Sequence, residues 1–107
     1  MLPFQPFMYS VVQTIAVGTT PQTITLASCQ PPENLVGPIQ VCVSCVGSEQ
    51  VYMAWNGNAQ VPSTGQGNSI PVPLGASSIF SFPANGELSF VAGATGTNVS
   101  ISIGSGE

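Results

Sequence analysis

The chain has 107 residues, enough for one folded domain, and only four of them are charged. All four are glutamates, and there is no Lys, Arg, His or Asp (Glu33, Glu49, Glu87 and Glu107). This composition excludes binding to nucleic acids or anionic membranes, because both need Lys or Arg, and it excludes acid–base catalysis by histidine. Stability must come from apolar burial and hydrogen bonds, because no cationic side chain can pair with the glutamates.

The first eight residues, MLPFQPFM, are expected to form an extended N-terminal arm. They are apolar without alternating, and they lack the basic start of a secretory signal, so we expect synthesis in the cytoplasm. An arm of this kind either folds back on its own domain or lies on a partner, and we favour the partner. Phe4, Phe7 and Met8 are the expected partner-binding residues, because aromatic residues and Met are enriched in interface cores.

Residues 9–107 are expected to form a single domain, because apolar and polar residues alternate with period two along nearly all of it. Turn residues divide this part into about eight short strands at spacings typical of a sandwich or barrel: 10–17, 22–28, 39–45, 51–55, 69–74, 77–82, 87–92 and 97–103. No segment shows the spacing of an amphipathic helix. The sequence therefore predicts an all-β fold, a single antiparallel β-sandwich that is jelly-roll-like.

The stretch IPVPL, residues 70–74, predicts an edge strand. Pro71 and Pro73 lack the backbone N–H, and residues two apart in a strand point their N–H groups to the same side. One side of this strand therefore cannot form its ladder bonds, which places it at the edge of a sheet with Ile70, Val72 and Leu74 facing the core. A polyproline-like connector is the alternative interpretation.

Three cysteines are present, and two of them form a Cys-x-x-Cys motif at Cys42 and Cys45. The motif lies in a strand pattern, so alternation places the two side chains on opposite faces. Redox chemistry would need a helix N-terminus, and zinc would need further ligands beyond Cys29. We expect three free structural thiols and neither a metal nor any other cofactor.

Trp55 and Tyr52, beside the polar loop 56–68, suggest a sugar-binding patch, although packing of Trp55 in the core with Val51 and Met53 is favoured. The glutamates are scattered, and none lies in a context that suggests the carboxylate pair of a glycosidase. We therefore expect no catalytic residues and no enzyme activity.

From residue 38 onward the chain resembles small β-sandwich virion proteins of tailed bacteriophages. The resemblance lies in the succession IQVCVSCVGSEQVYMAW, a polar loop, IPVPLGASSIFSF and GELSFVAGATGTNVSISI. Its marks are strand spacing and turn positions: Val51-Tyr52, Gly75, Phe80, Phe82, Gly86-Glu87-Leu88 and Ala94-Thr95-Gly96-Thr97-Asn98-Val99. It covers roughly the last 70 residues and contains no catalytic signature.

The resemblance implies a structural role in a virion, as a protein that decorates or cements a bacteriophage capsid. The implied partners are the major capsid protein or another virion protein, and homo-oligomeric assembly is expected because closed symmetric assemblies are common. Two alternatives stay open. One is a receptor- or glycan-binding fibre head, and the other is a self-assembling surface-layer or pilus-like subunit.

Overall fold

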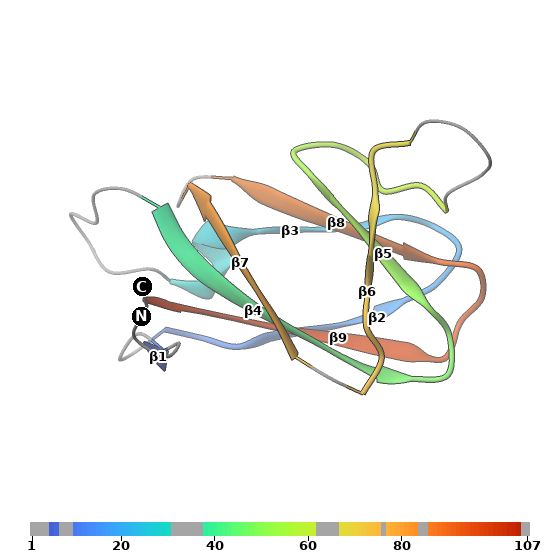
Figure 1. Ribbon diagram of the computed structural model, residues 1–107, viewed down its shortest axis with the longest axis horizontal. Helices are drawn as coiled ribbons and strands as arrows, with labels where there is room; N and C mark the ends of the chain where they lie inside the picture. Colours follow the sequence, from blue (N-terminus) through green and yellow to red (C-terminus); the bar gives the residue numbers. More distant parts are fainter. Residues whose placement is uncertain are drawn as a thin grey trace.

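Alternating apolar and polar residues form strands along most of the chain (Figure 1). The computed structural model describes residues 5–6, 10–30, 38–61, 67–75, 77–83 and 86–105. Within these residues run nine strands and one short 3-10 helix: β1 Gln5–Pro6, β2 Gln13–Val17, β3 Gln22–Thr25, η1 Leu26–Cys29, β4 Pro38–Gly47, β5 Val51–Trp55, β6 Ile70–Val72, β7 Ser77–Pro83, β8 Glu87–Ala92 and β9 Thr97–Ser105.

The strands form two antiparallel sheets that pack face to face. The first sheet has the order β2-β9-β4-β7, and β1 also pairs with β9, beyond the end of β2. The second sheet has the order β3-β8-β5-β6. The chain changes sheet at every connection after β2 except the one between β5 and β6. This is the double-sheet arrangement of a jelly roll, so the predicted fold class is confirmed.

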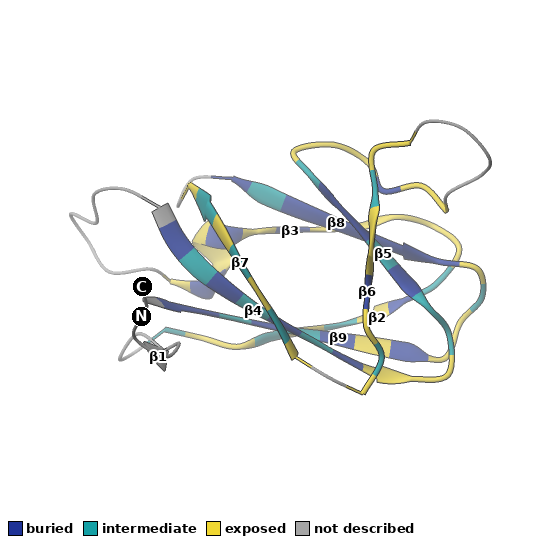
Figure 2. Cartoon of the chain, viewed as in Figure 1, coloured by how far each residue is buried: buried dark blue, intermediate teal, exposed yellow. Residues whose placement is uncertain are grey.

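Apolar side chains from both sheets meet in one core. β4 shows the alternation most clearly, with Ile39, Val41, Val43 and Cys45 buried between the sheets while Gln40 and Ser44 turn outward (Figure 2). β9 contributes its own buried face (Val99, Ile101 and Ile103). Full burial of each such side chain stabilises the fold by roughly 1.5–3 kcal/mol, which is the main source of stability in a chain with so few charges.

The predicted strand 22–28 is wrong beyond Thr25, because Leu26–Cys29 form η1 instead. The Ser28 hydroxyl donates to the Thr25 carbonyl at 2.6 Å, which favours a tight turn over an extended chain. In a 3-10 helix residues three apart lie on one face, so Leu26 and Cys29 both reach the core. Alternation up to Leu26 cannot distinguish these two outcomes.

The two sheets differ on their outer faces. Residues 56–61 fold over the outer face of the second sheet, where Ala59 packs with Ala54 and Val91. The Ala59 N–H donates to the Ser89 hydroxyl at 2.9 Å, so Ser89 is buried on a face that alternation would leave in water. β8 is consequently covered on both faces from Leu88 to Ala92.

Candidate assembly surface

One side of the sandwich, between β2 and β3, is closed by hydrogen bonds to η1. The Val11 N–H donates to the Cys29 carbonyl at 2.9 Å, and the Gln13 side-chain amide donates to the Ser28 carbonyl at 2.9 Å. The Ser10 hydroxyl also donates to the Gln30 carbonyl just after η1, at 2.9 Å. These contacts join the strands on that side across the gap between the two sheets.

The opposite side of the sandwich is bordered by β6, and the predicted edge position of this strand is confirmed. Among the described strands β6 pairs with β5 only, with Pro71 opposite Tyr52. The regular strand is shorter than expected, and Leu74 forms a single parallel bridge to Cys45 in β4. Val72 is fully buried and Leu74 packs on the core, as predicted, but Ile70 is 46% exposed because it borders an open groove.

β7 borders the same open side on the first sheet, and it differs from β6 in length and composition. It has seven residues, and among the described strands it pairs with β4 only. Its sequence, SSIFSFP, contains no charge and no proline before its last residue. Exposed and half-buried residues alternate along it, and no residue is fully buried (Figure 2). Among the described residues, no strand pairs with the outer edge of β7.

An aromatic cluster lies between these two edges. The rings of Trp55 and Phe82 stack at a centroid distance of 4.4 Å with an angle of 4° between their planes, and Phe80 lies 6.0 Å from Phe82. Trp55 packs against the core, as favoured from the sequence, although its ring is only partly buried. Gly86 lies directly against the Trp55 ring, where any Cβ would overlap it.

These aromatic rings line a groove of about 230 Å³ together with Met53, Asn68, Ile70 and Ser81. Phe82 covers one face of the Trp55 ring, and Gly86 leaves little room beside it. Tyr52 lies on the other face of β5, packed on the Ala54 cluster. This geometry does not present Trp55 or Tyr52 as an open platform for stacking a sugar ring.

The outer face of the first sheet carries several hydroxyl side chains. A row of four hydroxyl residues crosses it from β2 to β7, in the order Thr14, Ser100, Ser44 and Ser77. The Ser44 and Ser77 hydroxyls are 2.7 Å apart, and those of Thr14 and Ser100 are 3.0 Å apart. The described strands of this sheet contain no charged residue. The described strand residues of this face are therefore uncharged, and four of its hydroxyls are hydrogen-bonded in two pairs.

Apolar side chains interrupt this hydroxyl face at Val46, which is 71% exposed, and at Ile79, which is 50% exposed. Cys42 lies beside Ile79 in the register of β4 and β7, on the same outer face. Cys45 is buried in the core, so the prediction that the two cysteines point to opposite faces is confirmed. Burial raises the pKa of Cys45, and it also raises that of Cys29, although a hydrogen bond with Ser28 acts in the opposite direction.

The proposed anchors Phe4, Phe7 and Met8 lie outside the described residues. The structure describes the backbone of Gln5–Pro6 between them, where β1 pairs with Ser105 and Gly104 of β9. This short stretch of the arm therefore runs along the first sheet of its own domain.

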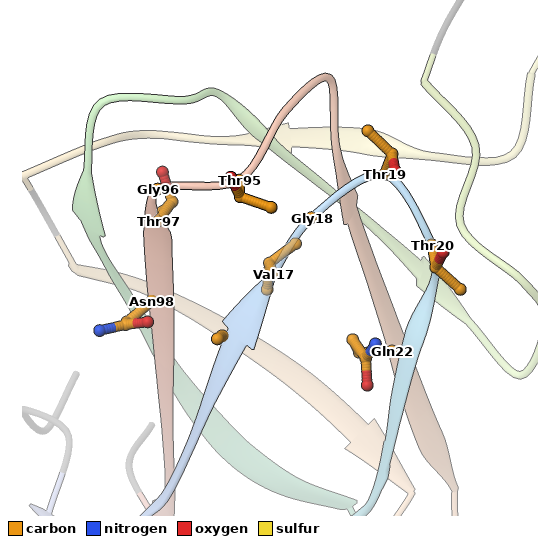
Figure 3. Close-up of a pocket in the computed structure, with 10 residues that line it drawn as sticks. Val17, Gly18, Thr19, Thr20, Gln22, Thr95, Gly96, Thr97 and Asn98 are labelled. Carbon is orange, nitrogen blue, oxygen red and sulfur yellow. The ribbon is translucent and has the colours of Figure 1, made fainter.

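A second hollow, of about 480 Å³, lies at one tip of the sandwich between the β2–β3 and β8–β9 turns (Figure 3). Thr19, Thr20 and Gln22 line it from one turn, and Thr95 and Asn98 line it from the other. The Ala92 N–H donates to the Gly18 carbonyl at 2.8 Å, which holds the two turns together. The hollow offers neutral hydrogen-bonding groups and no aromatic ring.

The described residues contain no group of three His, Cys, Asp or Glu side chains placed to hold a metal ion. Of the glutamates, Glu49 is fixed by its backbone, whose N–H donates to the Thr97 hydroxyl and whose carbonyl accepts from it, both at 2.8 Å. Glu33 and Glu107 lie outside the described residues. Within the described residues, no helix has the length and apolar character needed to cross a membrane.

The β7 edge and the tip hollow are the two surface features that sequence reasoning missed. The lack of charge in SSIFSFP was visible, but its position at an edge depends on strand order, which local patterns do not encode. No protein-family model, curated protein or solved structure matches the chain. Function must therefore be inferred from the fold and from the chemistry of its surface.

Proposed function

We propose that this chain is a non-enzymatic structural protein of a virion, which decorates or cements a capsid surface. The jelly roll is shared by viral capsid proteins, lectins and sugar- or metal-binding cupins, so surface chemistry must choose among these roles. The observation that carries the proposal is the uncharged outer face of the first sheet, with its hydroxyl row and the exposed Val46 and Ile79.

Such a face suits repeated protein contacts. Hydroxyl side chains keep the protein surface polar without adding charge. The isolated apolar side chains supply contact area for a partner. The absence of Lys and Arg removes charge attraction to packaged nucleic acid. The proposed partner is the major capsid protein or another virion protein, and the proposed location is the virion.

The N-terminal arm, residues 1–8, is proposed to anchor the chain on that partner through Phe4, Phe7 and Met8. Pro3 and Pro6 each fix one backbone dihedral, and Gln5–Pro6 already pair with β9, so less conformational entropy is lost when the arm docks. Deleting residues 1–8, or changing Phe4 and Phe7 to Ala, should leave the circular dichroism spectrum of the sandwich unchanged while abolishing incorporation into particles. Full occupancy by the truncated chain would move the anchor to the sandwich itself.

A receptor- or glycan-binding fibre head is the second candidate, because the tip hollow presents neutral hydrogen-bonding side chains (Figure 3). The hydroxyls of Thr19 and Thr95 and the amides of Gln22 and Asn98 suit an uncharged sugar better than an ionic ligand. Weak shifts of the Thr95 and Asn98 amide resonances on addition of neutral oligosaccharides would favour this role over cementing.

The virion proposal is tested on particles purified from the source of the chain by density gradient. Quantitative mass spectrometry should find the chain at a fixed ratio to the major capsid protein, and cryo-electron microscopy should place it on the capsid exterior. A chain that stays in the soluble fraction, or that occurs at a variable and trace ratio, would overturn the proposal.

A further inference from the structure

Among the described strands, the first sheet ends in β2 and β7, with the two-residue β1 beside β2, and the second sheet ends in β3 and β6. An edge strand presents unpaired backbone groups that bind another strand unless something blunts them. β2 and β3 border the side closed by the hydrogen bonds to η1. β6 carries Pro71 and is followed by Pro73, which remove two backbone donors. In the described residues no comparable protection covers β7.

β7 is also the longest of these edges, with seven residues against five in β2, four in β3 and three in β6. Alternate residues of an antiparallel strand direct their N–H and C=O groups to one neighbour. Half of the backbone groups of β7 therefore point away from β4, toward the open side of the sandwich. Its only proline, Pro83, is the last residue and leaves the middle of the strand intact.

We propose that β7 pairs antiparallel with β7 of a second copy of this chain. A twofold axis perpendicular to the sheet, near the middle of β7, would join the first sheets of the two copies into one continuous sheet. Contacts of this kind use the same patch on both subunits, which makes them self-complementary and closed. This pairing does not require the virion role, although Ile79 lies both at the β7 edge and on the outer face proposed to contact the capsid, so pairing is tested on the isolated chain.

The side chains of β7 match this arrangement on both faces of the sheet. On the inner side, Phe80 and Phe82 are half-buried and border the groove, so the same rings from a second copy extend the aromatic cluster. On the outer side, Ile79 is 50% exposed and gains an apolar neighbour across the junction. Aromatic and β-branched pairs across strands are the contacts that stabilise sheets.

Charge favours a second copy over a charged peptide as the occupant. Each copy has a net charge of −4, but no glutamate lies in β7, so the two strands meet without like charges opposite each other. A basic or acidic peptide finds no counter-charge along this edge. When two copies of β7 pair antiparallel, the inner-facing residues of both copies lie on one side of the joined sheet. The outer-facing residues of both copies lie on the other side.

The test uses the full-length chain in sedimentation velocity over a range of concentrations, with Ile79→Lys as the disrupting variant. Two lysines would then face each other near the twofold axis, and the dimer dissociation constant should rise by about 100-fold or more. Val12→Lys adds the same charge at an exposed residue before β2, at the far edge of the sheet, and should leave the dimer intact.

Amide hydrogen exchange measured by NMR separates edge pairing from any other contact. In the dimer, both alternating sets of amides from Ser78 to Phe82 should be protected, whereas in Ile79→Lys only the set bonded to β4 should remain so. A wild-type chain that stays monomeric at millimolar concentration would overturn the proposal. A dimer in which one set of β7 amides still exchanges freely, such as a dimer formed through the outer face, would overturn the proposal as well. So would a dimer whose dissociation constant Ile79→Lys leaves unchanged.

Discussion

β6 and β7 are consecutive strands on the same open side of the sandwich, yet their edges differ in length and in the number of backbone donors. β6 is short and contains Pro71, and Pro73 follows directly after its end, so the outer side of this segment lacks two donors. β7 has seven residues and keeps its donors up to Pro83. Many proteins protect edges with lysine, and this chain has none. Proline therefore removes donors from one edge of this sandwich, while the other edge keeps the donors that the proposed self-association requires.

The two edges are linked by a short crossover from the second sheet to the first. The Gly75 N–H donates to the Cys45 carbonyl at 2.9 Å, and Leu74 pairs with Cys45 as a parallel bridge. Beside this crossover, where β6 ends, the Gln50 side-chain amide donates to the Val72 carbonyl at 2.7 Å. β6 and β7 therefore share supports in β4 and β5, and changes to those supports should affect both edges.

The largest effect is expected from removing the aromatic support between the edges. Trp55→Ala deletes the ring that stacks on Phe82 and packs on the core, and it should lower the free energy of unfolding by about 3 kcal/mol. Urea denaturation measures this change. Trp55→Phe keeps an aromatic ring and should cost less than half as much. A loss below about 0.5 kcal/mol for Trp55→Ala would show that the stack does not support β7.

A smaller effect is expected at high pH, because burial raises the pKa of Cys29 and of Cys45 above the ordinary value of 9.0. The unfolded chain then loses these protons first, so the stability from the neutral thiols is complete below pH 9. It is lost as the pH rises through the folded-state pKa values, by up to about 1.4 kcal/mol per pH unit for each thiol.

Urea denaturation at pH 8, 9 and 10 should show this decline in the free energy of unfolding. Ionisation of Cys45 should also weaken the connection from β6 to β7, which contacts Cys45. The double variant Cys29→Ala, Cys45→Ala is the control, since it lacks both thiols and should have a shallower slope between pH 9 and 10. Equal slopes for the two proteins would assign the decline to other groups.

The comparison is tested most directly by restoring the backbone donors that proline removes from the edge at β6. Pro71→Thr with Pro73→Thr restores both donors of β6 and should change the free energy of unfolding by no more than about 1 kcal/mol. The second open edge should produce assemblies larger than a dimer, seen as a concentration-dependent rise in light scattering. Pro21→Thr, in the turn before β3, is the matched control and should not associate further. Unchanged light scattering from the double variant would mean that the two prolines are not what prevents strand pairing at the edge of β6.

The smallest effect is expected from salt. Because β7 carries no charge, the dissociation constant of the wild-type dimer should change by less than about threefold between 50 and 500 mM NaCl. Sedimentation at both concentrations measures this. A change of tenfold or more would place the contact near the glutamates and away from β7.

Local patterns predicted the elements of this fold well. Alternation identified the inward residues of β4 and β9, and the spacing of Pro71 and Pro73 identified an edge strand. The separation of Cys42 from Cys45 followed from the same period. These features depend on a few adjacent residues, whose side-chain directions are set by the strand backbone itself.

Only the tertiary structure decided which strands pair and which surfaces stay open. The closure of β2 on η1, the burial of Ser89 under Ala59 and the open edge of β7 all join residues far apart in the chain. The tip hollow likewise needs two turns about 75 residues apart to meet. The sequence by itself determined most strands, the inward faces of β4 and β9 and the edge position of β6, because the direction of side chains along a strand is a local property. The tertiary structure decided which strands pair and that the edge of β7 stays without a partner among the described strands. Strand pairing depends on the burial of residues that are far apart in the sequence.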